Sequence, residues 1–193
     1  MENKTFVFIG AGTGLFSAAA IYKKKNDASG RGQETREGAE LMVLGIIGEN
    51  CSGKSTLAEK IKETLGGEII TGKDYLRMAK SESEASSLFR EKLSRAVSRD
   101  NIIYVITDPE HVKLLPDGAI RILVTADLET IKERFAARMH GNLPVPVALM
   151  LERKHGMFDS GEYDYRFDGV AGDAEAFCEV LKRDLCRPMR KRQ

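Results

Sequence analysis

The octapeptide GENCSGKS, at residues 48–55, has the spacing G-x-x-x-x-G-K-[ST] in full. A continuous apolar run, 41–47, precedes it, and an amphipathic stretch with Leu57, Ile61 and Leu65 four residues apart follows it. A buried strand, a glycine-rich turn and a helix are therefore expected in immediate succession. In that setting successive backbone N–H groups surround an anion, and the positive N-terminal end of the helix adds to their attraction for phosphate. The stretch predicts a nucleotide-binding loop.

The side chains of this loop have separate expected roles in binding a nucleotide and its metal. The Lys54 ammonium is expected to reach the β- and γ-phosphates of a nucleotide, and the Ser55 hydroxyl is expected to ligate its Mg²⁺. Cys51 is expected to contribute its backbone and no thiol chemistry. The residues expected at the nucleotide are Gly48, Glu49, Asn50, Cys51, Ser52, Gly53, Lys54, Ser55 and Thr56.

Outward from the loop, apolar strands alternate with amphipathic helices. The helix after the loop is expected to end at Gly66-Gly67, and Asp127 is expected to cap a later one. Such alternation is typical of an α/β fold, with a mostly parallel sheet covered by helices on both faces. Strands are expected at 41–47, 68–71, 102–107, 120–125 and 165–170, and further helices at 81–97, 128–139 and 177–185.

Two of the later helices can be assigned an inward face from their spacing. In the 81–97 segment the expected face holds Ala85, Leu88, Phe89, Leu93 and Ala96. In the last helix the expected inner residues are Phe177, Val180, Leu181 and Leu185.

The composition excludes several classes of protein. The chain has 193 residues, of which 42% are hydrophobic and 31% charged, so it can bury a sizeable core and is neither disordered nor collagen-like. Its formal net charge of +1 provides no overall positive field, and nucleic acid is not an expected partner.

The cysteines and histidines give no metal-binding pattern. The 3 cysteines (Cys51, Cys178 and Cys186) are too few and too scattered for a disulfide framework or a zinc site, so a reducing, cytoplasmic compartment is expected. The histidines, His111, His140 and His155, have no metal-ligand spacing and are expected on the surface.

The N-terminal segment differs from the rest of the chain. Residues 5–22 carry no charge and are followed at once by Lys23, Lys24 and Lys25. As a helix this run would span about 27 Å, close to the thickness of a bilayer core, and the lysines would keep its C-terminal side cytoplasmic. Three interpretations are open: a membrane anchor that tethers the protein to the inner face of the membrane, a soluble or disordered extension, or a cleaved signal.

Changes in composition divide the chain into four parts. An apolar segment (1–22) precedes a polar linker (23–40), and a basic tail (188–193) follows the domain that contains the loop (41–187). Nothing in the sequence indicates the oligomeric state.

Four stretches of the domain, in order, resemble the nucleoside monophosphate kinases, in particular the cytidylate-kinase-like and adenylate-kinase-like branches. The first is the loop itself. The second is ITGKDYLR (70–77), similar to the segment where the family binds its acceptor, and the third is the apolar strand that ends in Asp108. The fourth, 124–138, resembles the strand and the arginine-bearing helix that enters the family's lid. The resemblance implies a P-loop fold with a five-stranded parallel sheet in the order 2-3-1-4-5 and a small lid.

The resemblance also implies roles for individual residues. Asp74 and Arg77 would contact the acceptor, and Asp108 would hold Mg²⁺ through water. Arg134 and Arg138, together with Lys54, would stabilise charge on the migrating phosphoryl group. The lid would span 139–159 and exclude water. Its expected phosphate-binding cations are Arg153 and Lys154.

The chain departs from the family after the third strand. The family places an arginine there for the acceptor phosphate, whereas this chain has DPEH at 108–111. The sequence is therefore compatible with two functions. The first is ATP-dependent phosphoryl transfer to a small molecule, with a nucleoside monophosphate as the leading acceptor. The second is a nucleotide-binding regulatory or scaffold protein with little turnover.

Overall fold

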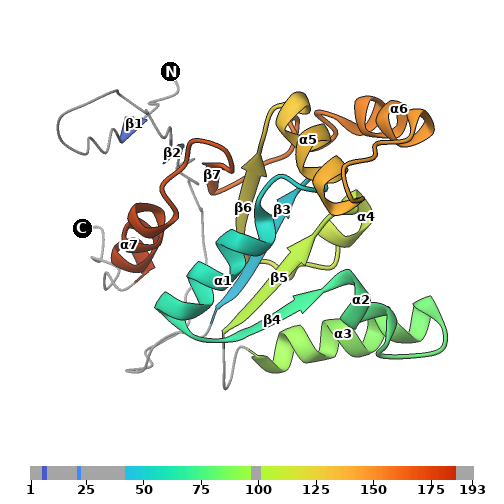
Figure 1. Ribbon diagram of the computed structural model, residues 1–193. Coiled ribbons are helices and arrows are strands. Elements are labelled where there is room, and N and C mark those ends of the chain that lie inside the picture. Colours follow the sequence, from blue (N-terminus) through green and yellow to red (C-terminus); the bar gives the residue numbers. More distant parts are fainter. Residues whose placement is uncertain (1–5, 8–20, 23–41, 97–100, 186–193) are drawn as a thin grey trace.

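The computed structural model describes residues 6–7, 21–22, 42–96 and 101–185. Its centre is a five-stranded sheet in which the strands are ordered β4-β5-β3-β6-β7 and all neighbours are parallel (Figure 1). Numbered along the sheet, this order is 2-3-1-4-5, which confirms the expected α/β fold. The strands are β3 (Val43–Gly48), β4 (Glu68–Thr71), β5 (Ile102–Ile106), β6 (Ile120–Thr125) and β7 (Tyr165–Asp168).

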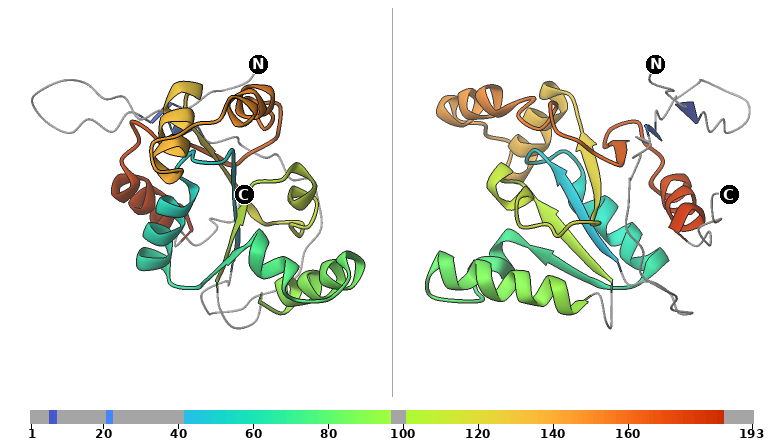
Figure 2. Two further views of the ribbon diagram at one scale, coloured as in Figure 1. Left: turned by 45° about the vertical axis from the view of Figure 1, so that its right-hand side comes forward. Right: turned by 180° about the vertical axis from the view of Figure 1, so that it is seen from behind.

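The helices lie in two layers on either side of this sheet (Figure 2). On one side α1 and α7 pack against β3, β6 and β7, and on the other α2, α3 and α4 pack against β4 and β5. α5 and α6 lie beyond the carboxyl ends of the strands, next to the loop 48–56. The helices are α1 (Lys54–Leu65), α2 (Gly72–Leu76), α3 (Glu82–Ala96), α4 (Pro109–Val112), α5 (Leu128–Arg138), α6 (Val145–Lys154) and α7 (Ala174–Leu185).

Local signals place the helix ends where the sequence predicts them. The Gly66 N–H donates to the Lys62 carbonyl at 2.9 Å, and Gly66 has a positive φ of 71°, which glycine adopts without strain. At the start of α5 the Asp127 carboxylate accepts from the Thr130 N–H at 2.8 Å. The expected cap of α5 is therefore confirmed.

The core residues agree with the expected faces except at Leu88, and the side chain of Ala96 lies outside the described part of the structure. On α3, Ala85, Phe89 and Leu93 are buried against the sheet, but Leu88 is 42% exposed. Leu88 lies at the margin of the apolar stripe and is not part of the buried cluster that Ala85, Phe89 and Leu93 join. Met139, the last residue of the helix expected at 128–139, is the C-cap of α5 and is 46% exposed.

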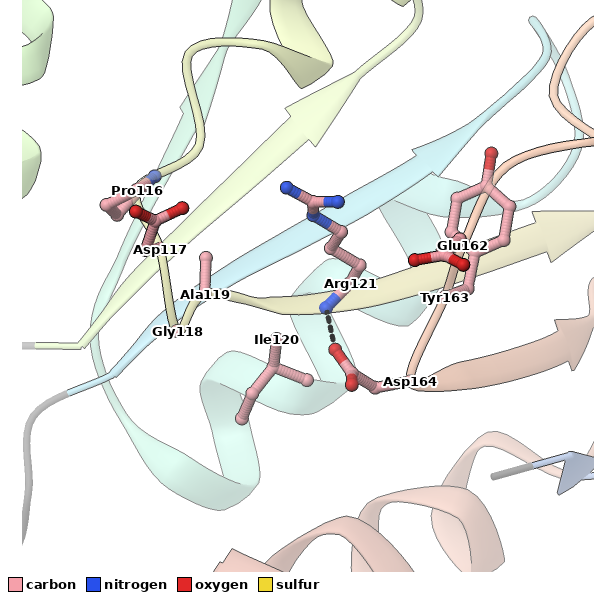
Figure 3. Close-up of a pocket in the computed structure, with 9 residues that line it drawn as sticks. All are labelled: Pro116, Asp117, Gly118, Ala119, Ile120, Arg121, Glu162, Tyr163 and Asp164. Atoms are coloured by element: carbon pink, nitrogen blue, oxygen red, sulfur yellow. Dashed lines mark hydrogen bonds between the residues drawn. The ribbon is translucent and has the colours of Figure 1, made fainter. Parts of the chain in front are cut away.

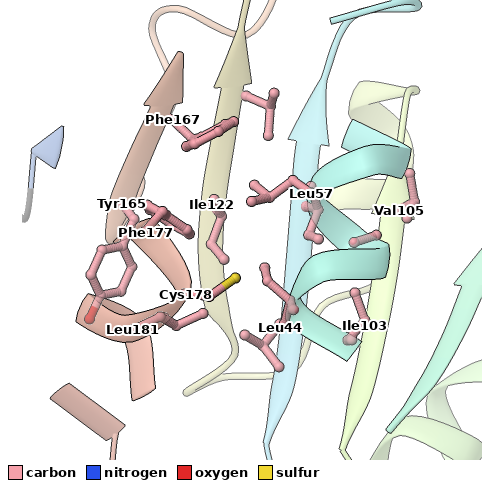
Figure 4. Close-up of a cluster of buried hydrophobic side chains, with 14 of the residues drawn as sticks. Leu44, Leu57, Ile103, Val105, Ile122, Tyr165, Phe167, Phe177, Cys178 and Leu181 are labelled. Carbon is pink, nitrogen blue, oxygen red and sulfur yellow. The ribbon is translucent and has the colours of Figure 1, made fainter. Parts of the chain in front are cut away.

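The α7 helix is part of the domain and closes one side of it. Its Phe177 ring is fully buried and contacts the rings of Tyr165 and Phe167 edge-on, at 5.9 and 5.2 Å between centroids. Leu181 on the same helix is also fully buried, and Figure 4 shows these side chains meeting those of β3 and α1. The packing fixes the turn between β7 and α7, which lies beside the loop 48–56.

The N-terminal segment is described at only two places. Strand β1 (Phe6–Val7) pairs antiparallel with strand β2 (Ile21–Tyr22). Among the described residues, no helix is long and apolar enough to cross a membrane. The rest of the segment 5–22, the linker 23–40 and the tail 188–193 lie outside the described residues, so the expectations for them stay predictions.

Replacing Phe177 with alanine should lower the free energy of unfolding by about 3–5 kcal/mol, because it removes a buried ring and leaves a cavity. Chemical denaturation of the full chain measures this change. Val170→Ala is the control: Val170 is 48% exposed, and its truncation should change stability by less than about 0.5 kcal/mol. Equal effects of the two substitutions would contradict the packing of α7 on the sheet.

Candidate active site

The loop 48–56 curls between the end of β3 and the start of α1 as its glycine pattern predicts. Gly53 is the N-cap of α1 with a φ of 105°, and Cys51 also has a positive φ of 63°. A positive φ is uncommon for a residue with a side chain, and such strain is usually found where the surrounding structure requires the turn. The Cys51 side chain packs with Ile131 of α5 and Leu151 of α6, consistent with a role for its backbone and none for its thiol.

Lys54 lies inside this turn. It is only 6% exposed, and its Nζ donates a hydrogen bond to the Glu49 carbonyl. Burial disfavours the charged ammonium and lowers the pKa of Lys54 to about 8. The neighbouring side chains of Ser55 and Thr56 are exposed and line the adjoining cavity, where the sequence places a metal and phosphates.

The Glu49 side chain joins the loop to the segment expected to form a lid. Its carboxylate accepts a hydrogen bond from the Gly156 N–H at 2.7 Å and lies 3.1 Å from His155 Nδ1. Gly156 and His155 directly follow α6. The carboxyl end of this helix is thus attached to the loop, and His155, exposed as expected, has Glu49 as a specific partner.

Arg134 uses its guanidinium to bridge two turns. Nη1 donates to the Cys51 carbonyl at 3.2 Å, and Nη2 donates to the Gly169 carbonyl at 2.9 Å. Gly169 belongs to the turn between β7 and α7, and a Cβ atom on it would lie 1.8 Å from the Ser52 carbonyl oxygen. The arginine expected to contact phosphates is therefore engaged in holding the loop against this turn.

Arg138, one helical turn further along α5, is placed differently. It is exposed and lines both of the larger cavities beside the loop, of about 460 and 430 Å³. Its positive charge contributes to lowering the pKa of Lys54, although less than burial does. The structure therefore brings Arg138 and Lys54 together at one opening.

Asp74, expected to contact an acceptor, makes local contacts with Thr71. Its Oδ2 accepts from the backbone N–H of Thr71 at 2.9 Å and from the Thr71 hydroxyl at 2.6 Å, which forms a capping box at the start of α2. The hydrogen bonds from Thr71, first from its hydroxyl and then from its backbone, lower the pKa of Asp74. Arg77, the C-cap of α2, is exposed. Neither side chain lines the cavity of about 460 Å³, whereas their neighbours Lys73 and Leu76 do.

Asp108 also caps a short helix. Its Oδ1 accepts from the Glu110 N–H at 3.0 Å at the start of α4, and its side chain is exposed. The cavity of about 460 Å³ is lined by Ser55 and by Thr107, the residue before Asp108, but not by Asp108 itself. The position of Ser55 is therefore compatible with direct contact to a metal carried by a nucleotide. The position of Asp108 is compatible with contact through a water molecule only. The described residues contain no cluster of histidine, cysteine or acidic side chains that could hold a metal by itself.

The cations expected in the lid belong to the last turn of helix α6. Arg153 Nε donates to the Leu149 carbonyl of its own helix α6 at 3.3 Å, and Lys154 is exposed at the end of that helix. Neither residue lines the two larger cavities beside the loop.

His111 was expected on the surface, but it lines the cavity of about 460 Å³. Its Nδ1 lies 2.7 Å from the Tyr104 hydroxyl, and its ring lies 4.7 Å from that of Tyr75. Sequence spacing could not reveal this site, because α2, β5 and α4 each contribute one of these rings.

A further cavity, of about 270 Å³, lies at the opposite end of the sheet (Figure 3). Its lining includes Ile120, the first residue of β6, and Asp164, which accepts from the Arg121 N–H at 2.9 Å just before β7. Since the loop 48–56 follows the carboxyl end of β3, this cavity is remote from Lys54.

Removal of the Arg134 side chain should destabilise the protein, whereas removal of the Arg138 side chain should not. Arg134→Ala loses two charge-assisted hydrogen bonds, so the free energy of unfolding should fall by about 2 kcal/mol or more. Arg138→Ala removes an exposed side chain from the same helix and should change it by less than about 0.5 kcal/mol. Denaturant titration measures both, and hydrogen exchange at residues 51–53 and 169–172 should accelerate in the first variant alone. Equal stability of the two variants would contradict the bridging role.

Comparisons with known proteins identify the fold. No protein-family model matches the sequence, and no curated protein matches it. Among solved structures, a sugar kinase from Janibacter is 17% identical with a TM-score of 0.53, over 76% of this chain and 96% of that one. A shikimate kinase from Acinetobacter baumannii is 15% identical with a TM-score of 0.54, over 79% and 97%. The tunicamycin resistance protein of Deinococcus radiodurans is 16% identical with a TM-score of 0.56, over 77% and 97%. The chain therefore has the α/β fold of P-loop kinases, and identities this low show the fold alone.

Proposed function

We propose that this chain is an ATP-dependent phosphotransferase that moves the γ-phosphoryl group of ATP·Mg²⁺ to a small molecule. The observation that carries the proposal is the cavity of about 460 Å³, in which Lys54 and Ser55 of the loop face Thr71, Lys73 and other residues that follow β4 and β5. A nucleotide bound to the loop would direct its terminal phosphate into this space. An acceptor of small size would then lie beside the phosphate to be transferred.

The charges around this cavity suit phosphoryl transfer. Lys54, Lys73 and Arg138 all line it, and preorganised cations stabilise the charge that spreads over the migrating group. Magnesium, held by Ser55 directly and by Asp108 through water, would neutralise further charge on the phosphates. The cavity of about 430 Å³, between Arg138 and the turn after β7, offers space for the base and ribose of the nucleotide.

For the acceptor we propose a nucleoside monophosphate, on the resemblance of the 70–77 and 124–138 segments to the kinases of these compounds. The missing arginine after Asp108 favours the second candidate, a nucleotide-binding regulatory protein with little turnover.

An assay that couples ADP release to NADH oxidation distinguishes the phosphotransferase from the regulatory protein. The full chain receives ATP and Mg²⁺, and each nucleoside monophosphate is added in turn beside a reaction without acceptor.

Stimulation of ADP release by one acceptor is the expected outcome, with CMP or dCMP the first to be tried. Lys54→Ala should reduce this rate at least about 100-fold, because the ammonium stabilises charge that develops on the phosphates. The matched control is Lys62→Ala, which removes an exposed lysine from the same helix and should leave the rate unchanged. Nucleotide binding with a flat rate across the panel would favour the regulatory protein.

The burial of Lys54 also predicts a pH dependence of nucleotide binding. Its pKa is lowered from 10.5 to about 8 by burial, and phosphates favour the protonated ammonium. Below about pH 8 the Lys54 ammonium is already charged before the nucleotide binds. Above about pH 8 the neutral amine must take up a proton when the nucleotide binds. The affinity for ATP·Mg²⁺ should therefore fall above about pH 8 by up to about tenfold per pH unit. Calorimetry in buffers of different ionisation enthalpy measures the affinity and the proton uptake. Lys54→Met should bind weakly with no such slope, and a slope that persists in this variant would contradict the assignment to Lys54.

A further inference from the structure

His111 is held in a fixed position at the cavity of about 460 Å³ by aromatic residues. It lies on the short helix α4, its Nδ1 is 2.7 Å from the Tyr104 hydroxyl, and its ring is 4.7 Å from the ring of Tyr75. Both tyrosines are buried, and the ring of Phe89 lies 4.6 Å from that of Tyr104. The imidazole therefore has little freedom to turn, and one ring nitrogen is already engaged.

The contact with Tyr104 determines which ring nitrogen carries the proton. Tyr104 is fully buried, and burial raises the pKa of its hydroxyl, so the phenol keeps its hydrogen. Among the described residues, Nδ1 of His111 is the only partner of this hydroxyl, and a buried O–H left without an acceptor is costly. The hydroxyl therefore donates to Nδ1, and the imidazole proton lies on Nε2. Nε2 has no hydrogen-bond partner among the described residues, and His111 lines the cavity.

The charges of the cavity indicate what kind of ligand this N–H meets. Lys54, Lys73 and Arg138 line the cavity, and no carboxylate does so among the described residues. An alcohol acceptor needs a base to take its proton as it attacks, and His111 with its proton on Nε2 offers none. An oxyanion acceptor needs no base, and its charge complements the lining.

We propose that His111, positioned by Tyr104, binds an anionic oxygen of the phosphate acceptor through its Nε2–H, and that the acceptor attacks through a phosphate or carboxylate oxygen. The inference rests on the proposed phosphotransferase function. One lone pair of the acceptor oxyanion forms the new bond to the γ-phosphorus, and the bond from that phosphorus to the β–γ bridging oxygen breaks. The bond electrons leave on ADP beside Lys54, and no proton is transferred.

Binding measurements that need no turnover test this inference. The full chain is saturated with a non-hydrolysable ATP analogue and Mg²⁺, so that probes cannot occupy the ATP site. Two matched pairs are then titrated by calorimetry: CMP against cytidine, and gluconate against sorbitol. CMP differs from cytidine by its phosphate group, and gluconate differs from sorbitol by its carboxylate. At least one charged probe should bind, and its neutral partner should bind at least about tenfold more weakly.

Three variants and one control assign the effect to the named residues. His111→Ala should weaken binding of the charged probe at least about tenfold, and His111→Gln should restore most of it, because the glutamine amide can present an N–H near the position of Nε2. Tyr104→Phe should weaken binding less and should shift the ¹⁵N resonances of His111 away from the Nε2–H tautomer. His140→Ala, an exposed histidine after α5, is the control and should bind as the wild type does.

The outcomes separate this inference from the proposed function. Equal binding of charged and neutral probes, unchanged binding by His111→Ala, or failure of every charged probe to bind would each overturn the role of His111. Turnover with an alcohol acceptor that is insensitive to His111 would overturn it too, while leaving the phosphotransferase in place. Binding that depends on His111 without any ADP release would support the site and contradict the phosphotransferase.

Discussion

The close approach of the β7–α7 turn to the loop 48–56 is the contact on which the site depends. A Cβ on Gly169 would lie 1.8 Å from the Ser52 carbonyl oxygen, so only a glycine allows the two backbones to meet. The Gly169 N–H donates to the Thr125 carbonyl at 2.7 Å, and Arg134 then joins the Gly169 and Cys51 carbonyls. Strand β6, helix α5, the turn and the loop are therefore joined by direct contacts. Cys51 holds its positive φ of 63° within this set of contacts, as strained residues do where the surrounding structure determines the backbone.

The main features of the fold could be predicted from local patterns, because each of them is encoded within a few residues. Apolar runs mark the strands, Gly66 ends α1, and Asp127 begins α5. The strand order came from the resemblance to known kinases, since periodicity says nothing about which strands pair. Leu88 shows the limit of periodicity: a helical stripe gives the direction of the core, but the burial of a residue at its margin depends on tertiary packing that the spacing does not contain.

The roles of individual site residues were harder to predict, because they depend on contacts between distant segments. Asp74 lies in a motif that resembles an acceptor site, but its carboxylate caps α2 through Thr71, which is three residues away. Arg134 and Arg138 share one helix face by spacing, yet one bridges two carbonyls and the other faces open cavities. His111 looked unremarkable because its partners, Tyr104 and Tyr75, lie on other elements of the fold. Sequence motifs indicate where the candidate site lies, and tertiary contacts determine which partners each side chain has there.

Glu49 shows how one residue of the loop can serve two segments independently. Its backbone carbonyl accepts from Lys54, and its carboxylate accepts from Gly156 after α6. Because the two contacts use different atoms, a phosphate bound at Lys54, as proposed, would replace the carbonyl without releasing the carboxyl end of α6. The charge that burial disfavours on Lys54 would be compensated by such a phosphate. The loop would then change its partner at Lys54 while its contacts with α6, α5 and the β7–α7 turn stay in place.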